Sequence, residues 1–128
     1  MKRISATIPN EIIKKFDEIC KDLGYKNRSN AISSALYEFI IVNQWTKQKG
    51  NIAGAILITY LHKKSINDFL VDIQHEYNDV VNASMHIHLS KEKCLEIVAV
   101  SGNAKKIKEL FKRIKGLKGI LTTKFVSA

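Results

Sequence analysis

The chain has 128 residues, of which 45% are hydrophobic and only one is proline. This composition describes a folded protein of one ordinary domain or two small ones and excludes a disordered chain. The formal net charge of +9, from 21 Lys and Arg against 12 Asp and Glu, points to nucleic acid or another polyanion as a partner. No apolar run is long enough to span a bilayer and the chain starts on polar residues, so we expect a cytoplasmic protein with no membrane partner.

Residues 2–8 alternate between polar and apolar side chains and therefore predict a β-strand, with Arg3, Ser5 and Thr7 on one face. The residues that follow are predicted to be helical and offer this strand no partner. An unpaired strand leaves its backbone amides and carbonyls without hydrogen bonds, so two copies of the chain must pair their strands. The sequence therefore predicts an obligate dimer through this segment.

Two helices are predicted after the strand. The first opens at Pro9, whose missing N–H costs nothing at that position, and ends at Gly24. The second follows side chains that can cap it, and apolar residues at helical spacing give it a buried stripe as far as Ile40. Residues 1–45 are therefore predicted to form a βαα domain.

Residues 46–51 are polar, contain a glycine and lack apolar periodicity, so we predict a linker there. The pattern then restarts, and residues 52–128 are predicted to form a second domain. Its elements are strand, helix, strand, strand, helix and strand over residues 52–61, 65–77, 80–89, 94–100, 104–114 and 120–126. This βαββαβ order is typical of a ferredoxin-like fold, with helices on one face of an antiparallel sheet. The predicted fold class is α+β.

Four residues of the second domain form a set suited to a transition metal: His75, His86, His88 and Cys94. His86 and His88 are two residues apart on a predicted strand, so both imidazoles lie on the same face. Cys94 begins the next strand, and a hairpin would bring its sulfur beside the imidazoles. Imidazole and thiolate together favour a transition metal over calcium or magnesium. Taken alone, His75 at the end of its helix is more often a capping or exposed histidine.

The polar face of the first predicted strand carries hydrogen-bond donors. Arginine can bond two acceptors of guanine and hydroxyls can serve several base edges, so Arg3, Ser5 and Thr7 suit a two-stranded ribbon in the major groove of DNA. An exposed edge strand with its polar residues outward would alone be the commoner explanation. The predicted dimer, the two helices and the positive charge favour the DNA-binding interpretation.

The start of the second helix carries Asn27, Arg28 and Ser29. These residues would direct backbone N–H groups and a guanidinium at phosphate. With this entry and the Gly24-Tyr25 turn, residues 1–45 resemble a ribbon-helix-helix DNA-binding domain.

With its second half included, the whole chain resembles the nickel-responsive repressors of the NikR family. That family joins a ribbon-helix-helix domain to a ferredoxin-like, ACT-type metal-binding domain. The motif that carries the resemblance is His75, ten residues, His86, one residue, His88, five residues and Cys94, followed by Leu95-Glu96. A lone His-x-His is a weak signal, but this four-ligand spacing behind such an N-terminal domain is specific.

The resemblance implies a homotetramer, built as a dimer of dimers, with one Ni(II) per subunit. His86, His88 and Cys94 would bind nickel from one subunit and His75 from a neighbouring subunit, in a square-planar site. Nickel would promote binding to operator DNA and so repress nickel-uptake genes, and the protein would not be an enzyme. The ligand types alone would also suit tetrahedral zinc, because only geometry separates the two metals.

Two other functions fit part of the pattern. A zinc- or cobalt-dependent enzyme would need an open coordination position and a general base, for which Glu96 is the only obvious candidate. An ACT-like regulator that senses an amino acid would explain the second domain and leave the His/Cys set unexplained. DNA retention that depends on the metal separates these functions.

A few further residues bear on the predicted sites. Glu96 and Gln74 could orient the imidazoles, although a solvated glutamate and glutamine explain them equally well. His62 is predicted to be a surface histidine, with a secondary metal site near it as the less favoured alternative. Asn30 and Ser34 stand where some members of the family carry acidic residues of an interdomain cation site, so the resemblance does not carry that site over.

Overall fold

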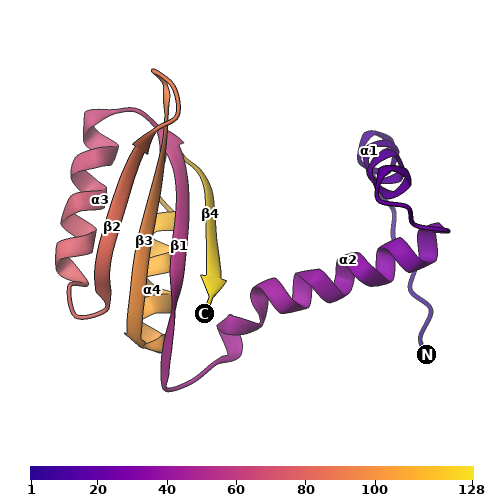
Figure 1. Ribbon diagram of the computed structural model, residues 1–128, viewed down its shortest axis with the longest axis horizontal. Helices are drawn as coiled ribbons and strands as arrows, with labels where there is room; N and C mark the ends of the chain where they lie inside the picture. Colours follow the sequence, from indigo (N-terminus) through magenta and orange to yellow (C-terminus); the bar gives the residue numbers. More distant parts are fainter. The chain divides into compact units, whose positions relative to one another are not determined.

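The computed structural model describes all 128 residues, which form two compact units, Met1–Ile41 and Val42–Ala128. The first unit is helical, and the second is a sheet with helices packed on it (Figure 1). No helix has both the length and the apolar character needed to cross a membrane.

The two helices predicted for the first unit are present. Helix α1 spans Asn10–Asp22 directly after Pro9, and Gly24 takes a positive φ of 80° in the turn that follows. Helix α2 spans Arg28–Asn43. The side chain of Asn27 caps α2 by accepting a hydrogen bond from the Asn30 backbone N–H at 2.9 Å, as its position before the helix predicts.

The strand predicted over residues 2–8 is not formed in the single chain, where residues 1–9 have no regular secondary structure. The physical reason is that nothing within the chain offers this segment a neighbouring strand, and a strand without one cannot satisfy its backbone. The apolar side chains of the unit are likewise uncovered: Ile12 is 53% exposed and Phe39 67%. Helix α1 has no buried residue, and Ala31 is the only buried residue of α2.

The second unit has the predicted order of strands and helices. Its elements are β1 (Asn51–Leu61), α3 (Lys64–Glu76), β2 (Val81–His88), β3 (Lys93–Asn103), α4 (Ala104–Lys115) and β4 (Ile120–Ser127). The strands form one antiparallel sheet in the order β2-β3-β1-β4. Both helices lie on the same face of the sheet (Figure 1). The predicted α+β architecture of this half is therefore confirmed.

The core lies between the sheet and its two helices. Strand β1 buries alternate residues, among them Ile56 and Ile58 with no exposed surface, as expected for a strand covered on one face. Leu70 of α3 and Ile107 of α4 close the core from the other side. Gly54 is needed in β1 because a Cβ there would lie 2.2 Å from the Val126 carbonyl oxygen.

A short helix η1 (Gln44–Lys47) is held on this core by Trp45, which is only 4% exposed. The indole packs against Phe125 of β4 at 4.3 Å between ring centroids and edge-on against Phe111 of α4 at 5.0 Å. The Gln48 carbonyl oxygen then accepts a hydrogen bond from Lys108 Nζ at 2.6 Å. The start of the segment predicted as a linker is therefore attached to helix α4.

Replacing the indole tests this attachment. Trp45→Ala is expected to lower the free energy of unfolding by about 3–5 kcal/mol, because a large buried ring is lost and a cavity is left. Urea denaturation followed by far-UV circular dichroism measures the change. The control is Lys47→Ala in the same short helix, where an exposed side chain should change stability by no more than about 0.5 kcal/mol. Equal losses in both variants would contradict a role for the ring.

Candidate functional site

Three strands bring polar side chains together on the helix-covered face of the sheet. Cys94 of β3 is paired with Tyr60 of β1 on one side and with His88 of β2 on the other. Two positions along β3, Glu96 is paired with His86. Because alternate residues of a strand share a face, all five side chains lie on the face that α3 and α4 cover. The hairpin between β2 and β3 therefore places Cys94 beside His88, whereas His86 lies further along the same face, beside Glu96.

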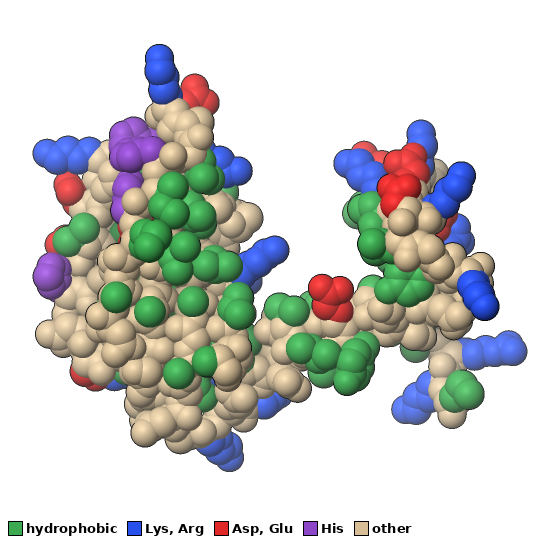
Figure 2. Space-filling model, viewed as in Figure 1, with side chains coloured by type: hydrophobic (Ala, Val, Ile, Leu, Met, Phe, Trp, Pro, Cys, Tyr) green, Lys and Arg blue, Asp and Glu red, His purple; other side chains and the backbone are tan.

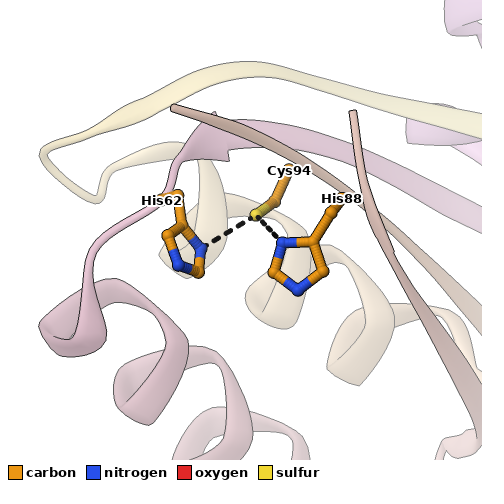
Figure 3. A group of neighbouring side chains, drawn as sticks. All are labelled: His62, His88 and Cys94. Carbon is orange, nitrogen blue, oxygen red and sulfur yellow. Dashed lines mark hydrogen bonds between the residues drawn. The ribbon is translucent and has the colours of Figure 1, made fainter. Parts of the chain in front are cut away.

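Cys94 is fully buried, and two imidazoles approach its sulfur (Figure 3). Its Sγ lies 3.7 Å from Nδ1 of His88 and 3.3 Å from Nδ1 of His62. The three residues each offer one ligand atom, and these atoms all lie within 4.8 Å of one another. This group is the tightest arrangement of metal-ligating side chains in the chain.

His62 is exposed, as predicted, but its place beside Cys94 was missed by the sequence analysis. The signal that could have found it is the strand register. Tyr60 is paired with Cys94 near the end of β1, so the first residue beyond Leu61 lies beside the thiol. The ferredoxin-like order predicts that the first and third strands are neighbours, but the sequence does not give the register between them.

His86 lies next to His88, with 4.7 Å between the ring centroids. Its Nδ1 is 2.8 Å from the Tyr60 hydroxyl and 3.4 Å from Glu96 Oε1. The Tyr60 hydroxyl in turn donates to Glu96 at 3.3 Å. With the hydroxyl hydrogen used in this way, His86 donates from Nδ1 to the tyrosine oxygen, which leaves the Nε2 lone pair available to a metal.

Glu96 is a buried carboxylate, 7% exposed, and it accepts a hydrogen bond from the Gln74 side-chain amide as well as from Tyr60. Burial and the neighbouring Glu96 charge raise the pKa of Tyr60 well above its ordinary value, so its hydroxyl stays protonated. Gln74 and Glu96 thus lie in one hydrogen-bond network that ends at His86, rather than being separately solvated.

His75, the remaining predicted ligand, lies apart from the sulfur. It is exposed at the end of α3, and its ligand atoms are not part of the group around Cys94. It lines a cavity of about 520 Å³ together with Gln74, His86 and Glu96. One chain therefore brings His88 beside Cys94, with His86 on the same face of the sheet but outside the group at the sulfur, and leaves His75 exposed.

The donor atoms around Cys94 fit a transition metal. They are a thiol and imidazoles, and no carboxylate belongs to the group, so a hard cation such as calcium or magnesium finds no oxygen ligands there. Burial, and after it the charge of Glu96, raises the pKa of the Cys94 thiol. Metal binding must therefore release a proton from the sulfur.

In the first unit, Arg3, Ser5 and Thr7 are exposed in the segment without regular structure. Arg3 lines a hollow of about 580 Å³ together with Arg28 and Ser29 from the start of α2. The chain thus brings the arginine predicted to face bases close to two of the residues predicted to face phosphate.

Arg28 already has a partner within the chain. Its Nη2 and Nε donate to the Asp17 carboxylate of α1 at 2.6 and 3.1 Å. Both side chains are about half exposed, at 56% and 42%, so solvent weakens the pair. A phosphate could replace Asp17 as the partner of this guanidinium at small cost.

Comparison with known proteins identifies the second unit. Residues 53–128 match the family described as the NikR C-terminal nickel-binding domain. The chain is 40% identical over 125 residues to a protein of Pyrococcus horikoshii named as a nickel-responsive regulator, covering 97% of this chain and 91% of the relative. A regulator of the same name from Methanocaldococcus jannaschii is 40% identical over 126 residues, covering 97% and 89%.

Solved structures resemble the fold at low sequence identity. The ACT domain from GTP pyrophosphokinase of Chlorobium tepidum superposes with a TM-score of 0.51 at 12% identity, over 61% of this chain and 89% of that one. An uncharacterized protein from Thermotoga maritima gives a TM-score of 0.55 at 10% identity, over 60% and 96%. At these identities the likeness shows the fold alone, and it supports the ACT-like α+β architecture.

The network around Glu96 predicts a cost when the carboxylate is removed. Glu96→Ala is expected to lower the free energy of unfolding by about 1–3 kcal/mol, because the Tyr60 hydroxyl and the Gln74 amide lose a buried acceptor. Urea denaturation of the metal-free protein measures the change. Glu92→Ala, at an exposed position in the turn between β2 and β3, serves as the control. Unchanged or increased stability of Glu96→Ala would contradict this account of the network.

Proposed function

We propose that this chain, which belongs to the NikR family of nickel-responsive regulators, is a nickel-dependent repressor that binds operator DNA. The observation that carries the proposal is the grouping of His86, His88 and Cys94 on adjacent strands of a unit that matches a nickel-binding domain. Its relatives are named as regulators and not as enzymes, and the protein is a regulator rather than an enzyme. Nickel-uptake genes are the expected target, and the cytoplasm is the expected location of the protein.

The proposed nickel ligands come from two subunits. His86, His88 and Cys94 of one chain would provide two nitrogens and a sulfur, and His75 of a neighbouring chain the third nitrogen. This division is supported by the position of His75, which is exposed at the end of α3 and so accessible to a neighbouring chain. A planar set of three nitrogens and one sulfur suits Ni(II). When bound, one nickel ion per subunit would link two chains through these four ligands.

Tyr60 and Glu96 would orient one of these ligands. Their hydrogen bonds fix the His86 ring and leave its Nε2 available. Such partners of a metal-binding imidazole commonly contribute ten- to hundredfold in metal affinity. Because Glu96 also bonds to Gln74, which precedes His75 in the chain, the same network supports the end of α3 from which the fourth ligand would come.

Assembly of several chains is supported by the uncovered face of the sheet. Side chains that point away from the helices include Ala55 and Leu57 of β1, Ile97 of β3 and Met85 of β2, which is 59% exposed. Apolar side chains gather on this face (Figure 2). An apolar sheet face is normally buried against another layer of structure rather than exposed to water. A second copy of the sheet would provide that layer.

The first unit also supports assembly with a second copy, on evidence separate from the sheet face. Its apolar helix faces are exposed and residues 2–8 have no strand partner. Pairing two copies of this segment would form a two-stranded ribbon with Arg3, Ser5 and Thr7 on one face, able to enter the major groove. Two dimers of this kind joined through the metal-binding units would make a homotetramer, a dimer of dimers.

The start of α2 would hold the DNA backbone. Asn27 already caps the helix, so the following backbone N–H groups point along the helix axis toward a bound anion. Ser29 adds a hydroxyl there, and Arg28 would exchange Asp17 for phosphate. These contacts position the protein on the duplex, while the ribbon reads the bases.

Nickel can act on DNA binding only through a difference in affinity. It must bind the DNA-competent arrangement of the tetramer more tightly than other arrangements, because an ion with equal affinity for all of them shifts nothing. A ligand set divided between chains provides such a difference, since it is complete only when the chains are correctly placed.

Mixing two inactive variants tests the division of ligands. His75→Ala and Cys94→Ala are each expected to lose the spectrum of planar, thiolate-bound Ni(II). After the two are unfolded and refolded together, about a quarter of the sites should regain all four ligands, because a site needs Cys94 from one chain and His75 from another. Absorption during nickel titration measures the recovery.

The matched control is the double variant His75→Ala/Cys94→Ala refolded with wild type, in which only sites built wholly from wild-type chains are complete. A mixture of the single variants that recovers no planar nickel would place all four ligands in one chain and contradict the shared site. Wild type that binds operator DNA equally well with and without nickel would overturn the proposed function itself.

Arg3→Ala tests the proposed contact with bases. Loss of a bidentate contact to guanine should weaken specific binding by about 1–3 kcal/mol and relax sequence preference at one position of each half-site. Selection of bound sequences from a random pool, followed by titration of the best operator, measures both effects. Lys2→Ala is the charge-matched control, expected to weaken binding to all sequences alike. Unchanged selectivity in Arg3→Ala would contradict the base contact.

A further inference from the structure

We propose that one side of helix α4 is a binding surface for the phosphate backbone of double-stranded DNA, formed by a lysine row of Lys105, Lys108, Lys112 and Lys115. The surface belongs to the second unit and is separate from the ribbon and from the start of α2. It would contact the duplex without reading its sequence. That the bound duplex includes the operator rests on the proposed function, whereas the affinity for duplex DNA does not.

Most of the net charge of the chain lies in the second unit. Met1–Ile41 carries seven Lys and Arg against five Asp and Glu, whereas Val42–Ala128 carries fourteen against seven. Seven of the nine net positive charges are therefore outside the unit proposed to read DNA. A charge excess of this kind attracts polyanions, and here it lies mainly on the second unit.

Helix α4 (Figure 1) concentrates this charge on its solvent side. Its buried residues face the core and are Ala104, Ile107, Leu110 and Ile114. The lysine row has helical spacing, and at about 1.5 Å of rise per residue it is about 15 Å long. Three of its four side chains are exposed, and Lys108 is half-buried. Glu109 is the only acidic residue of the helix.

The ion pairs of α4 are made by other residues than the lysine row. Lys106 pairs with Asp79, and Arg113 pairs with Glu76 at the end of α3. These two pairs lie on the side of α4 that faces α3, and no ion pair of the chain includes a residue of the row. The row therefore keeps its full charge for an external partner.

The row begins at a hollow of about 210 Å³, which Lys105 and Lys108 line together with Lys49. Lys108 is held there because its Nζ donates to the Gln48 carbonyl oxygen at 2.6 Å. This partner is uncharged, so the ammonium charge is not neutralised. Since buried Trp45 fixes the preceding residues on the core, the hollow exists before a ligand arrives. A phosphate group in it would meet three ammonium groups.

Duplex DNA fits this surface better than a membrane or a protein does. The apolar side of α4 is buried in the core, so no apolar side of the helix is left to insert into a bilayer. The exposed side chains of the helix are all charged, so the surface lacks the aromatic anchors typical of protein interfaces. DNA carries about one charge per 1.7 Å of its axis, so a row of this length would meet phosphates throughout.

The salt dependence of DNA binding tests the lysine row. Lys105→Gln/Lys112→Gln should make the slope of log affinity against log salt shallower by about 0.9 for each lysine lost, because fewer counterions are released. Affinities for operator and for scrambled duplex should fall by the same factor, since backbone contacts carry no sequence information. Fluorescence anisotropy of the full-length protein, with and without Ni(II), measures both effects, and circular dichroism checks the fold.

Two controls separate the row from charge in general. Lys105→Arg/Lys112→Arg keeps the charge and should keep the slope. Lys91→Gln/Lys93→Gln removes the same charge from exposed positions at the β2–β3 turn and should leave the slope within error of wild type.

Three results would overturn the proposed surface: an unchanged slope in Lys105→Gln/Lys112→Gln, an equal change in Lys91→Gln/Lys93→Gln, or a loss of binding confined to anionic phospholipid vesicles. Failure of the proposed function looks different. Wild type that shows neither operator preference nor a nickel response, but whose slope on scrambled duplex still depends on the row, would overturn the repressor and leave this surface standing.

Discussion

The register of strand β3 is the constraint on which the rest of the site depends. Cys94 is paired with Tyr60 on one side and with His88 on the other, so a single buried thiol lies between two strands that carry its partners. A slip of one residue in either pairing would turn the affected side chains to the opposite face. The apolar alternation of β1 and β3, fixed by packing against α3 and α4, therefore also sets the chemistry around the sulfur.

The single chain leaves three features incomplete, and in the proposed assembly another copy would complete each of them. Residues 2–8 have no strand partner, the outer face of the sheet is uncovered around Leu57 and Ile97, and His75 lies away from Cys94. These are different physical needs: backbone hydrogen bonds, burial of apolar surface and metal coordination. Because the proposed assembly meets all three, metal binding and oligomerisation would be coupled by construction and not by a separate device.

Local patterns predicted the second unit well, because its elements alternate apolar residues at helical or strand periods and each buries that face within the same chain. The spacing of His86, His88 and Cys94 was sufficient to place all three on one face of adjacent strands, with His88 beside Cys94. What could not be read locally depends on contacts between distant elements. The position of His62 follows from the β1–β3 register. The attachment of Trp45 follows from its contacts with the rings of Phe111 in α4 and Phe125 in β4. The strand predicted over residues 2–8 is not formed in the single chain, which offers this segment no neighbouring strand.

Selection between metals is the point where geometry must do what affinity cannot. Raw affinity follows a fixed order among divalent metals, so selectivity at a site of imidazole and thiolate depends on geometry rather than on binding strength alone. A site completed by His75 of a neighbouring chain would make the response depend on which ligands an ion gathers as well as on how tightly it binds. Only an ion that gathers the neighbour's ligand stabilises one arrangement of chains over another. On this scheme the occupancy of DNA would follow the coordination geometry of the bound metal.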